Sequence, residues 1–185
     1  MLTMTKKTVI GTVVAATLAL GAVAPVAEAG SRESRKTPTI VQLAIAANGD
    51  EAGPFYQQLD TLIAAVLAAD PAVLAFLQGN GQRTVFAPTD DAFADIGLNP
   101  DNVGTALTQA QLTQVLLYHV ANGRREAAEV LASDRIRTLE RSFLFQAGGV
   151  LTDELGRTAN IIATDIFAAN GVIHVIDAVV LPILD

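Results

Sequence analysis

In the first half of the chain, apolar residues recur every three or four positions, which is the spacing of one helix face. A first helix is predicted from Thr37-Pro38, with threonine as the cap and proline at the first helical position, to Asn48-Gly49. A second helix is predicted from Pro54, and Asp70-Pro71 repeats the cap-and-proline pattern for a third. The apolar stripe of the second helix consists of Phe55, Leu59, Leu62, Val66 and Ala69.

A short strand and another helix are predicted next. The segment "RTVFAP" (83–88) is rich in β-formers and ends at a proline. Thr89 then caps a helix that carries Asp90 in its first turn, where a carboxylate complements the helix dipole, and that ends at Gly97.

The sequence "TQAQ" (108–111) fits a capping box, so a further helix begins there and is predicted to end at Asn122-Gly123. His119 falls on the apolar stripe of this helix, which predicts a core histidine whose polar groups are satisfied. Tyr118 is one position off the stripe and is predicted to be partly exposed.

After a short helical piece around 126–131, the pattern changes to the alternation of β-strands. "RIRTLE", "SFLFQ" and "GVLTD" are predicted as short strands, with Gly148-Gly149 as a hairpin turn. "TANIIATDIFA" (158–168) and "VIHVIDAVVL" (172–181) are two longer strands joined at Asn170-Gly171.

His174 and Asp177 interrupt an otherwise aliphatic strand, and each is costly to bury without a partner. They are three residues apart, so they point to opposite faces and cannot pair with each other. A two-residue turn at Asn170-Gly171 places Thr164 opposite Asp177, to which it can donate, and Asp165 diagonally across from His174. We therefore predict that a set of polar side chains are internal structural ties that perform no reaction. These are Thr89, Asp90, His174 and Asp177.

The N-terminus has the three parts of a secretory signal peptide. "MLTMTKK" is a short basic start, residues 8–27 are apolar, and "AEA" ending at Ala29 is a small-x-small cleavage site. We predict a signal peptide at 1–29, a flexible lead-in at 30–36, a single domain at 37–185, and a protein that is secreted, periplasmic or held at the cell surface. The alternative is an uncleaved membrane helix.

Composition argues against several kinds of site. The chain has no cysteine, which excludes a disulfide, a thiolate metal site and a cysteine nucleophile. Its net charge of −7 disfavours nucleic acid and anionic membranes as partners. No serine after residue 30 stands in a nucleophile elbow, and two histidines on separate elements would need carboxylates to hold zinc. Asp90, Asp91 and Asp95 fit a solvated helix face better than a calcium site. We expect no enzyme activity, no cofactor and no metal.

Three segments of the chain resemble the conserved parts of the fasciclin-like domain and follow one another in the same order as in that domain. "TVFAPTDDAF" (84–93) and "NGVIHVIDAVVLP" (170–182) resemble its two boxes, and "LLYHV" (116–120) resembles the Tyr-His motif between them. The similarity extends over about residues 37–183. Residues 50–82 depart from the family by being longer than its usual helix-to-strand passage.

The resemblance implies a compact α+β wedge of two small β-sheets flanked by several helices, in a secreted bacterial protein. It also implies a role in adhesion or protein–protein recognition outside the cell. Two pairs of residues are implicated in integrin binding in animal members of the family. They are matched here by Tyr118-His119 and by Asp165-Ile166, which we carry over as candidate interaction positions without the integrin.

These observations predict a secreted, monomeric, single-domain module that binds an unknown protein or a cell-surface or matrix component. The alternative is an extracellular carrier of a small apolar ligand, a pigment or a lipid, held between helices and sheet. The carrier requires a contiguous apolar pocket of about 300 Å³ or more. An enzyme acting on extracellular polymers has little support from the residues.

Overall fold

The computed structural model describes residues 37–184. The predicted signal peptide at 1–29 and lead-in at 30–36 lie outside the described residues. The helices of the described part are α1 (Ile40–Gly49), α2 (Asp60–Ala68), α3 (Pro71–Gln78), α4 (Asp90–Ala94), α5 (Val103–Ala106), α6 (Gln109–Tyr118) and α7 (Ala127–Leu131). Its strands are β1 (Arg83–Pro88), β2 (Val120–Asn122), β3 (Arg135–Arg137), β4 (Phe143–Ala147), β5 (Val150–Thr152), β6 (Thr158–Ala168) and β7 (Gly171–Ile176).

The strands form one seven-stranded sheet in the order β2-β1-β7-β6-β5-β4-β3. The long strand β6 pairs with β7 along one part and with β5 along the other, so it joins what would otherwise be two sheets. A bridge between Ala121 and Thr138 brings the two ends of the order together, and the sheet is nearly closed. The predicted α+β class is confirmed, whereas the two separate small sheets are not, because the hydrogen bonding continues through β6.

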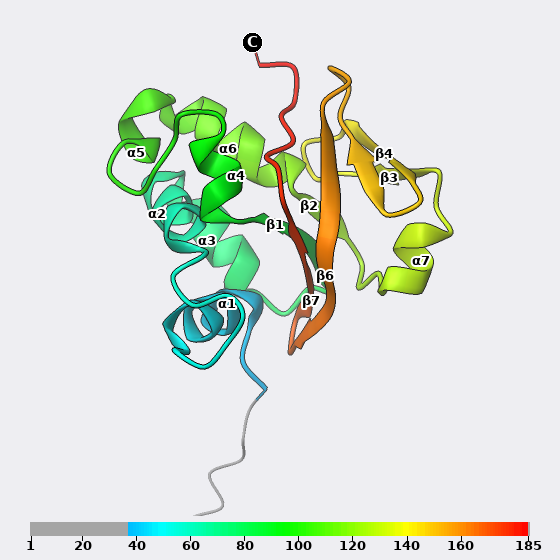
Figure 1. Cartoon of the computed structure of the whole chain (residues 1–185), viewed down its shortest axis with the longest axis horizontal. Coiled ribbons are helices and arrows are strands. Elements are labelled where there is room, and N and C mark those ends of the chain that lie inside the picture. Colours follow the sequence, from blue (N-terminus) through cyan, green and yellow to red (C-terminus); the bar gives the residue numbers. More distant parts are fainter. Residues whose placement is uncertain (1–36, 185) are drawn as a thin grey trace, which may run out of the picture. The chain divides into compact units, whose positions relative to one another are not determined.

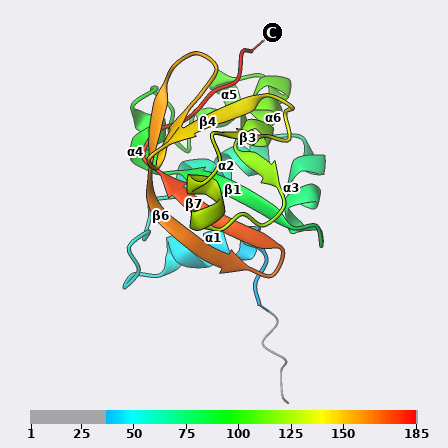
Figure 2. The same cartoon turned by 90° about the vertical axis from the view of Figure 1, so that its right-hand side faces the viewer.

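Helices α1 to α6 lie on one side of β1 and β7, whereas β3, β4 and α7 lie on the other side (Figure 1). The view turned by 90° looks onto this second side, with α7 in front of β6 and β7 (Figure 2). Every residue of β1 and β7 is buried. Strands covered on both faces are expected to have aliphatic residues in succession rather than in alternation, as these two do.

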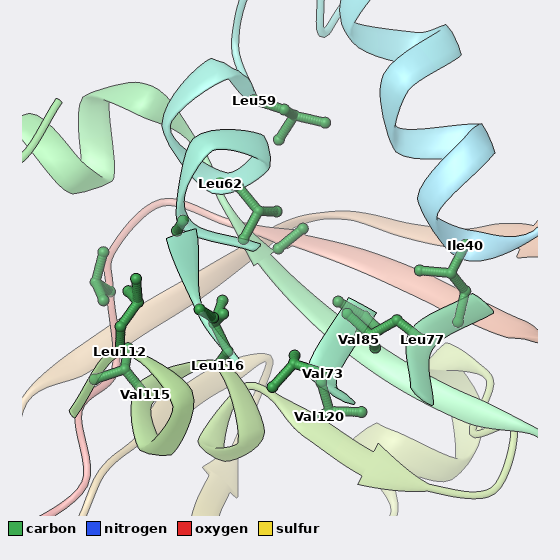
Figure 3. Packing of buried hydrophobic residues seen from close by; sticks show 14 of the residues in the cluster. Ile40, Leu59, Leu62, Val73, Leu77, Val85, Leu112, Val115, Leu116 and Val120 are labelled. Atoms are coloured by element: carbon green, nitrogen blue, oxygen red, sulfur yellow. The ribbon is translucent and has the colours of Figure 1, made fainter. Parts of the chain in front are cut away.

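Two clusters of buried side chains use alternate residues of β1. The first contains Val85 and Ala87, and side chains from α1, α2, α3 and α6 converge on it (Figure 3). The second contains Phe86 together with Ile136 and Leu144 from β3 and β4. Because successive side chains of a strand point to opposite faces, β1 separates the two cores and contributes to both.

The first helix begins slightly later than predicted. Its cap is Thr39, whose hydroxyl accepts the N–H of Gln42, while the Gln42 amide oxygen accepts the N–H of Thr39. This capping box satisfies two N–H groups of the helix start, which Thr37-Pro38 cannot do.

The second helix begins at Asp60 and not at Pro54. Residues 54–59 form turns instead, because Asn48 at the end of α1 binds this segment with its backbone oxygen on Gln57 and its side-chain oxygen on Leu59. The helix predicted to continue to Asn122 ends at Tyr118, and Val120–Asn122 pairs with β1 as its edge strand. Within residues 37–184 no single helix is long and apolar enough to cross a membrane; α2 and α3 pass that test only as a pair bent by 117°.

The hairpin between β6 and β7 turns one residue earlier than predicted, at Ala169-Asn170. The reason is that Asn170 is buried and its side chain joins two helices to the hairpin. Its Oδ1 accepts the N–H of Ile40, and its Nδ2 donates to the carbonyl oxygens of Leu77 and Gly79. Three hydrogen bonds to distant segments outweigh the local preference for Asn-Gly at the turn.

The first residue of β7 has no room for a side chain, because a Cβ on Gly171 would overlap the carbonyl oxygen of Arg83 and lie 2.7 Å from Ile40 Cδ1. We predict that Gly171→Ala lowers the free energy of unfolding by about 1–3 kcal/mol, as for other overpacked sites. Gly49→Ala is the matched control, since nothing lies within 4 Å of its Cβ position. Urea unfolding of both variants checks this, and equal midpoints would contradict it.

Candidate functional site

His174 lies in the middle of β7 and is fully buried. Its Nε2 lies 2.8 Å from the carbonyl oxygen of Arg125, and its Nδ1 faces the N–H of Asp165 at 3.4 Å. Since an N–H points at Nδ1, the ring proton is on Nε2 and is donated to Arg125. The ring also stacks on Phe86, with centroids 5.8 Å apart. Both nitrogens of this buried ring therefore have partners, one on the adjacent hairpin strand β6 and one in the distant loop before α7.

Asp165 sits in an irregularity of β6, where the pairing with β7 shifts between Ala163 and Ile166. Its φ of 58° is in the left-handed region, which aspartate tolerates better than most residues. The carboxylate turns toward α7 and accepts the N–H of Ala127 at 2.8 Å, at the first residue of that helix. The residue at the cap position of α7, Glu126, makes no side-chain cap bond. Asp165 therefore caps this helix from the strand β6.

The loop before α7 is held from several sides. Thr84 is fully buried, and its hydroxyl accepts the N–H of Arg125 and donates to the carbonyl of Gly123, both at 2.8 Å. With His174 and Asp165 bound to the same loop, residues 123–127 have a defined backbone next to β1, β6 and β7.

Two further residues predicted as structural ties, Asp177 and Thr89, also have partners inside the molecule. Asp177 accepts from the backbone and side-chain amides of Asn160, each at 2.7 Å, so the predicted donor Thr164 is wrong. The one-residue shift of the hairpin and the irregularity in β6 account for this difference. Thr89 caps α4, as its side chain accepts from Ala92.

Asp90 has a second use that the sequence does not indicate. Its carboxylate accepts the N–H groups of Asp60 and Thr61 at 3.1 and 2.8 Å, at the start of α2. The first residues of α2 have no cap from the preceding residue, Leu59. Asp90 thus supports two helix starts, its own and that of α2.

Tyr118 is fully buried, not partly exposed as predicted. It belongs to the second core cluster, and its hydroxyl donates to the carbonyl oxygen of Phe143 on β4 at 2.9 Å. Burial raises the pKa of Tyr118 to about 12. The prediction failed because the position off the helix stripe faces a second core, built by strands that follow later in the chain.

His119 is buried at the end of α6, as predicted. Its Nδ1 lies 2.7 Å from the carbonyl oxygen of Val115, to which it donates. Its Nε2 is buried without a partner, so the prediction that the polar groups of this ring are satisfied is wrong for that nitrogen. Burial lowers the pKa of His119 to about 4, so the ring is neutral near pH 7. Its carbonyl oxygen accepts the N–H of Phe86 on β1 at 2.9 Å, and its side chain borders the apolar cavity beside the first core.

A small apolar cavity of about 100 Å³ lies between α1, α2, α3 and β1, and His119 is among its lining residues. This volume is well below the roughly 300 Å³ that a small-molecule site requires. The carrier alternative therefore gains no support from the cavity.

Of the four candidate interaction positions, Tyr118 and His119 are shielded from solvent, and Asp165 and Ile166 are half-buried. The neighbouring Phe167 is 47% exposed, and Ile162 on the same strand is 53% exposed. The alternation along 158–168 does not indicate that two large apolar side chains of this strand would be left exposed. No cluster of three or more histidine or acidic side chains in residues 37–184 could hold a metal ion.

Comparison with known proteins gives the following relatives. The model of the fasciclin domain family matches residues 57–182. An uncharacterized protein of Synechocystis sp., sll1735, is 37% identical over 146 residues, which are 78% of this chain and 98% of the relative. The immunogenic protein MPB70 of Mycobacterium bovis is 31% identical over 128 residues, 68% of this chain and 64% of the relative.

Among solved structures, a FAS1 domain pair from the insect cell adhesion molecule Fasciclin I matches with a TM-score of 0.51 and 23% identity. The match covers 63% of this chain and 42% of that one. At this level of identity the likeness concerns the fold.

The cap that Asp165 provides can be tested with two substitutions. Asp165→Ala removes the acceptor for the N–H of Ala127 and places a residue with little tolerance for the left-handed region at that position. We expect it to lower the free energy of unfolding by about 1–2 kcal/mol. Asp165→Asn keeps an acceptor and the backbone tolerance, so most of the stability should remain. Chemical denaturation measures the free energy of unfolding of the two variants. If the alanine variant is as stable as the asparagine variant, Asp165 does not cap α7.

The lowered pKa of His119 predicts a dependence of stability on pH. An unfolded histidine titrates at about 6.5 and the folded one at about 4, so the fold favours the neutral ring. This contribution is complete above pH 6.5 and is lost as the pH falls from 6.5 to 4, by roughly 3 kcal/mol. His119→Gln should lose less stability between these pH values than the parent protein. Urea unfolding at several pH values measures it, and parallel curves would exclude the effect, since the carboxylates are common to both proteins.

Proposed function

This chain belongs to the fasciclin domain family, and we propose that it is a secreted module for adhesion or protein–protein interaction outside the cell. Its family membership supports this role, because fasciclin domains are generally linked to adhesion and extracellular interaction. The polar residues set within the fold support it further, since buried His174 and half-buried Asp165, Asp177 and Asp90 all bond to other segments of the protein.

We place the contact surface on β6 around Phe167, beside the Asp165-Ile166 pair; the Ile166 side chain itself points to the opposite face and packs against the first core. The observation that carries this is the exposure of Phe167, a large apolar side chain next to the Asp-Ile pair. The guanidinium of Arg124 lies 5.8 Å from its ring centroid and donates to the carbonyl of Ala168, which holds a cation beside the apolar patch. Aromatic and arginine side chains are the types that contribute most to protein interfaces.

Tyr118 and His119 do not lie on this surface, and we assign them a structural role that supports it through the fold. Tyr118 supports β4 through its bond to Phe143, and His119 ends the helix that precedes β2. Their substitution would therefore weaken binding through the fold, whereas substitution of Phe167 would act on the surface directly. The partner is a protein or another component of the cell surface or matrix, and the module acts as a monomer.

Phe167→Ser tests the surface. We expect it to leave the unfolding midpoint unchanged, because the side chain is largely exposed. Capture of the purified protein by the envelope of its own cell should weaken by at least about tenfold, which is the loss typical of a hot-spot aromatic residue. Leu67→Ser is the matched control, since Leu67 is an equally apolar and 68% exposed residue on α2. Capture that is equal for the two variants would place the contact elsewhere.

A further inference from the structure

A polar hollow of about 400 Å³ opens beside the anchored loop, at the place where the two ends of the sheet meet. The residues that line it are neutral or basic and come from β2, the loop before α7, β3 and the turn after β3. They are Asn122, Arg125, Arg137, Thr138, Leu139 and Arg141.

Three arginines thus line one hollow in a chain whose net charge is −7. Within residues 37–184, none of these three side chains has an ion-pair, hydrogen-bond or cation–π partner. The Nε of Arg125 is buried and unpartnered. The other arginines of this part are engaged: Arg157 pairs with Asp153, Arg124 donates to Ala168, and Arg83 and Arg135 lie over the rings of Phe76 and Phe143.

Like charges held together repel one another, and a bound anion removes this cost while satisfying the free N–H groups. Guanidinium groups match a carboxylate with two parallel hydrogen bonds. The backbone of Arg125 is fixed on both sides, by Thr84 at its N–H and by His174 at its carbonyl oxygen. Less conformational entropy is therefore lost when this arginine binds a ligand.

We propose that this hollow binds a uronate, a sugar unit that carries a carboxylate, from an extracellular acidic polysaccharide. The arginines take the carboxylate, the exposed amide of Asn122 takes ring hydroxyls, and Leu139 provides an apolar contact for the ring face. The volume exceeds what a single carboxylate or phosphate needs and has room for a sugar. This inference rests on the proposed extracellular binding role and names a second class of partner for it, at a surface separate from Phe167.

The test is a titration of the secreted protein, followed by NMR, with tri-galacturonate and with its methyl ester, which has the same sugars without the charges. We expect binding of the acid, weakened by added salt because the contacts are charged, and no binding of the ester. Inorganic phosphate and tri-glutamate distinguish other sources of negative charge. If either binds as tightly as tri-galacturonate, the hollow recognises charge or an acidic peptide, and the uronate proposal is overturned.

Three variants locate the site. Arg137→Gln should weaken tri-galacturonate binding about tenfold or more, as expected for the loss of one charged hydrogen-bond donor. Arg141→Gly removes a second guanidinium at a residue with φ of 84°, where glycine is well accommodated, so it should bind less without loss of stability. Arg135→Gln is the control with the same change of charge on the same strand, and its affinity should equal that of the parent.

The two proposals can fail separately. Phe167→Ser should bind tri-galacturonate normally, and Arg137→Gln should keep the envelope capture that depends on Phe167. If the three arginine variants bind tri-galacturonate alike, the hollow is not the site, whatever the outcome for Phe167. If Phe167→Ser leaves envelope capture unchanged while Arg137→Gln and Arg141→Gly weaken tri-galacturonate binding, the β6 surface is wrong and the uronate site stands.

Discussion

The burial of an imidazole in a strand that is covered on both faces is the constraint on which the rest of the structure depends. His174 can lie there only because both ring nitrogens have partners, and neither partner is in its own strand. One is the carbonyl of Arg125, which ties the loop before α7 to the sheet. The other is the N–H of Asp165, which is available because β6 is irregular at that point. An unsatisfied polar group at this depth costs about 1–3 kcal/mol, so loop, strand irregularity and ring position are coupled.

The same ties position the exposed residues to which we assign binding. The irregularity at Asp165 turns its carboxylate to α7 and is followed by the exposed Phe167. The bond from His174 fixes the backbone of Arg125, whose side chain lines the arginine hollow. The buried polar groups therefore act on function by holding two outer surfaces in place, and not by contact with a ligand. This explains why residues of the two fasciclin boxes are mostly internal in this chain.

The candidate site was partly predictable. The rule that polar groups set within a fold need partners predicts hydrogen bonds for four side chains, those of His174, Asp177, Thr89 and Asp90. Which partners they have does not follow: Asp177 uses Asn160, and Asp90 reaches the start of α2. The clustering of five of the seven arginines after Lys36 within residues 124–141 was visible in the sequence. Their convergence on one hollow was not, because some are engaged elsewhere and only the three-dimensional arrangement separates them.

By itself, the sequence determined what depends on residues a few positions apart. The caps at Thr108 and Asp70, the strand 83–88 and the turn at Gly148-Gly149 were readable for that reason. Tertiary structure alone decided the single continuous sheet, the burial of Tyr118 and the turn at Ala169-Asn170. In each of these the deciding contact joins segments far apart in the chain, as when Asn170 binds both α1 and the end of α3. Such contacts outweigh local preferences because their hydrogen bonds are buried, and no local pattern in the sequence records which segments will meet.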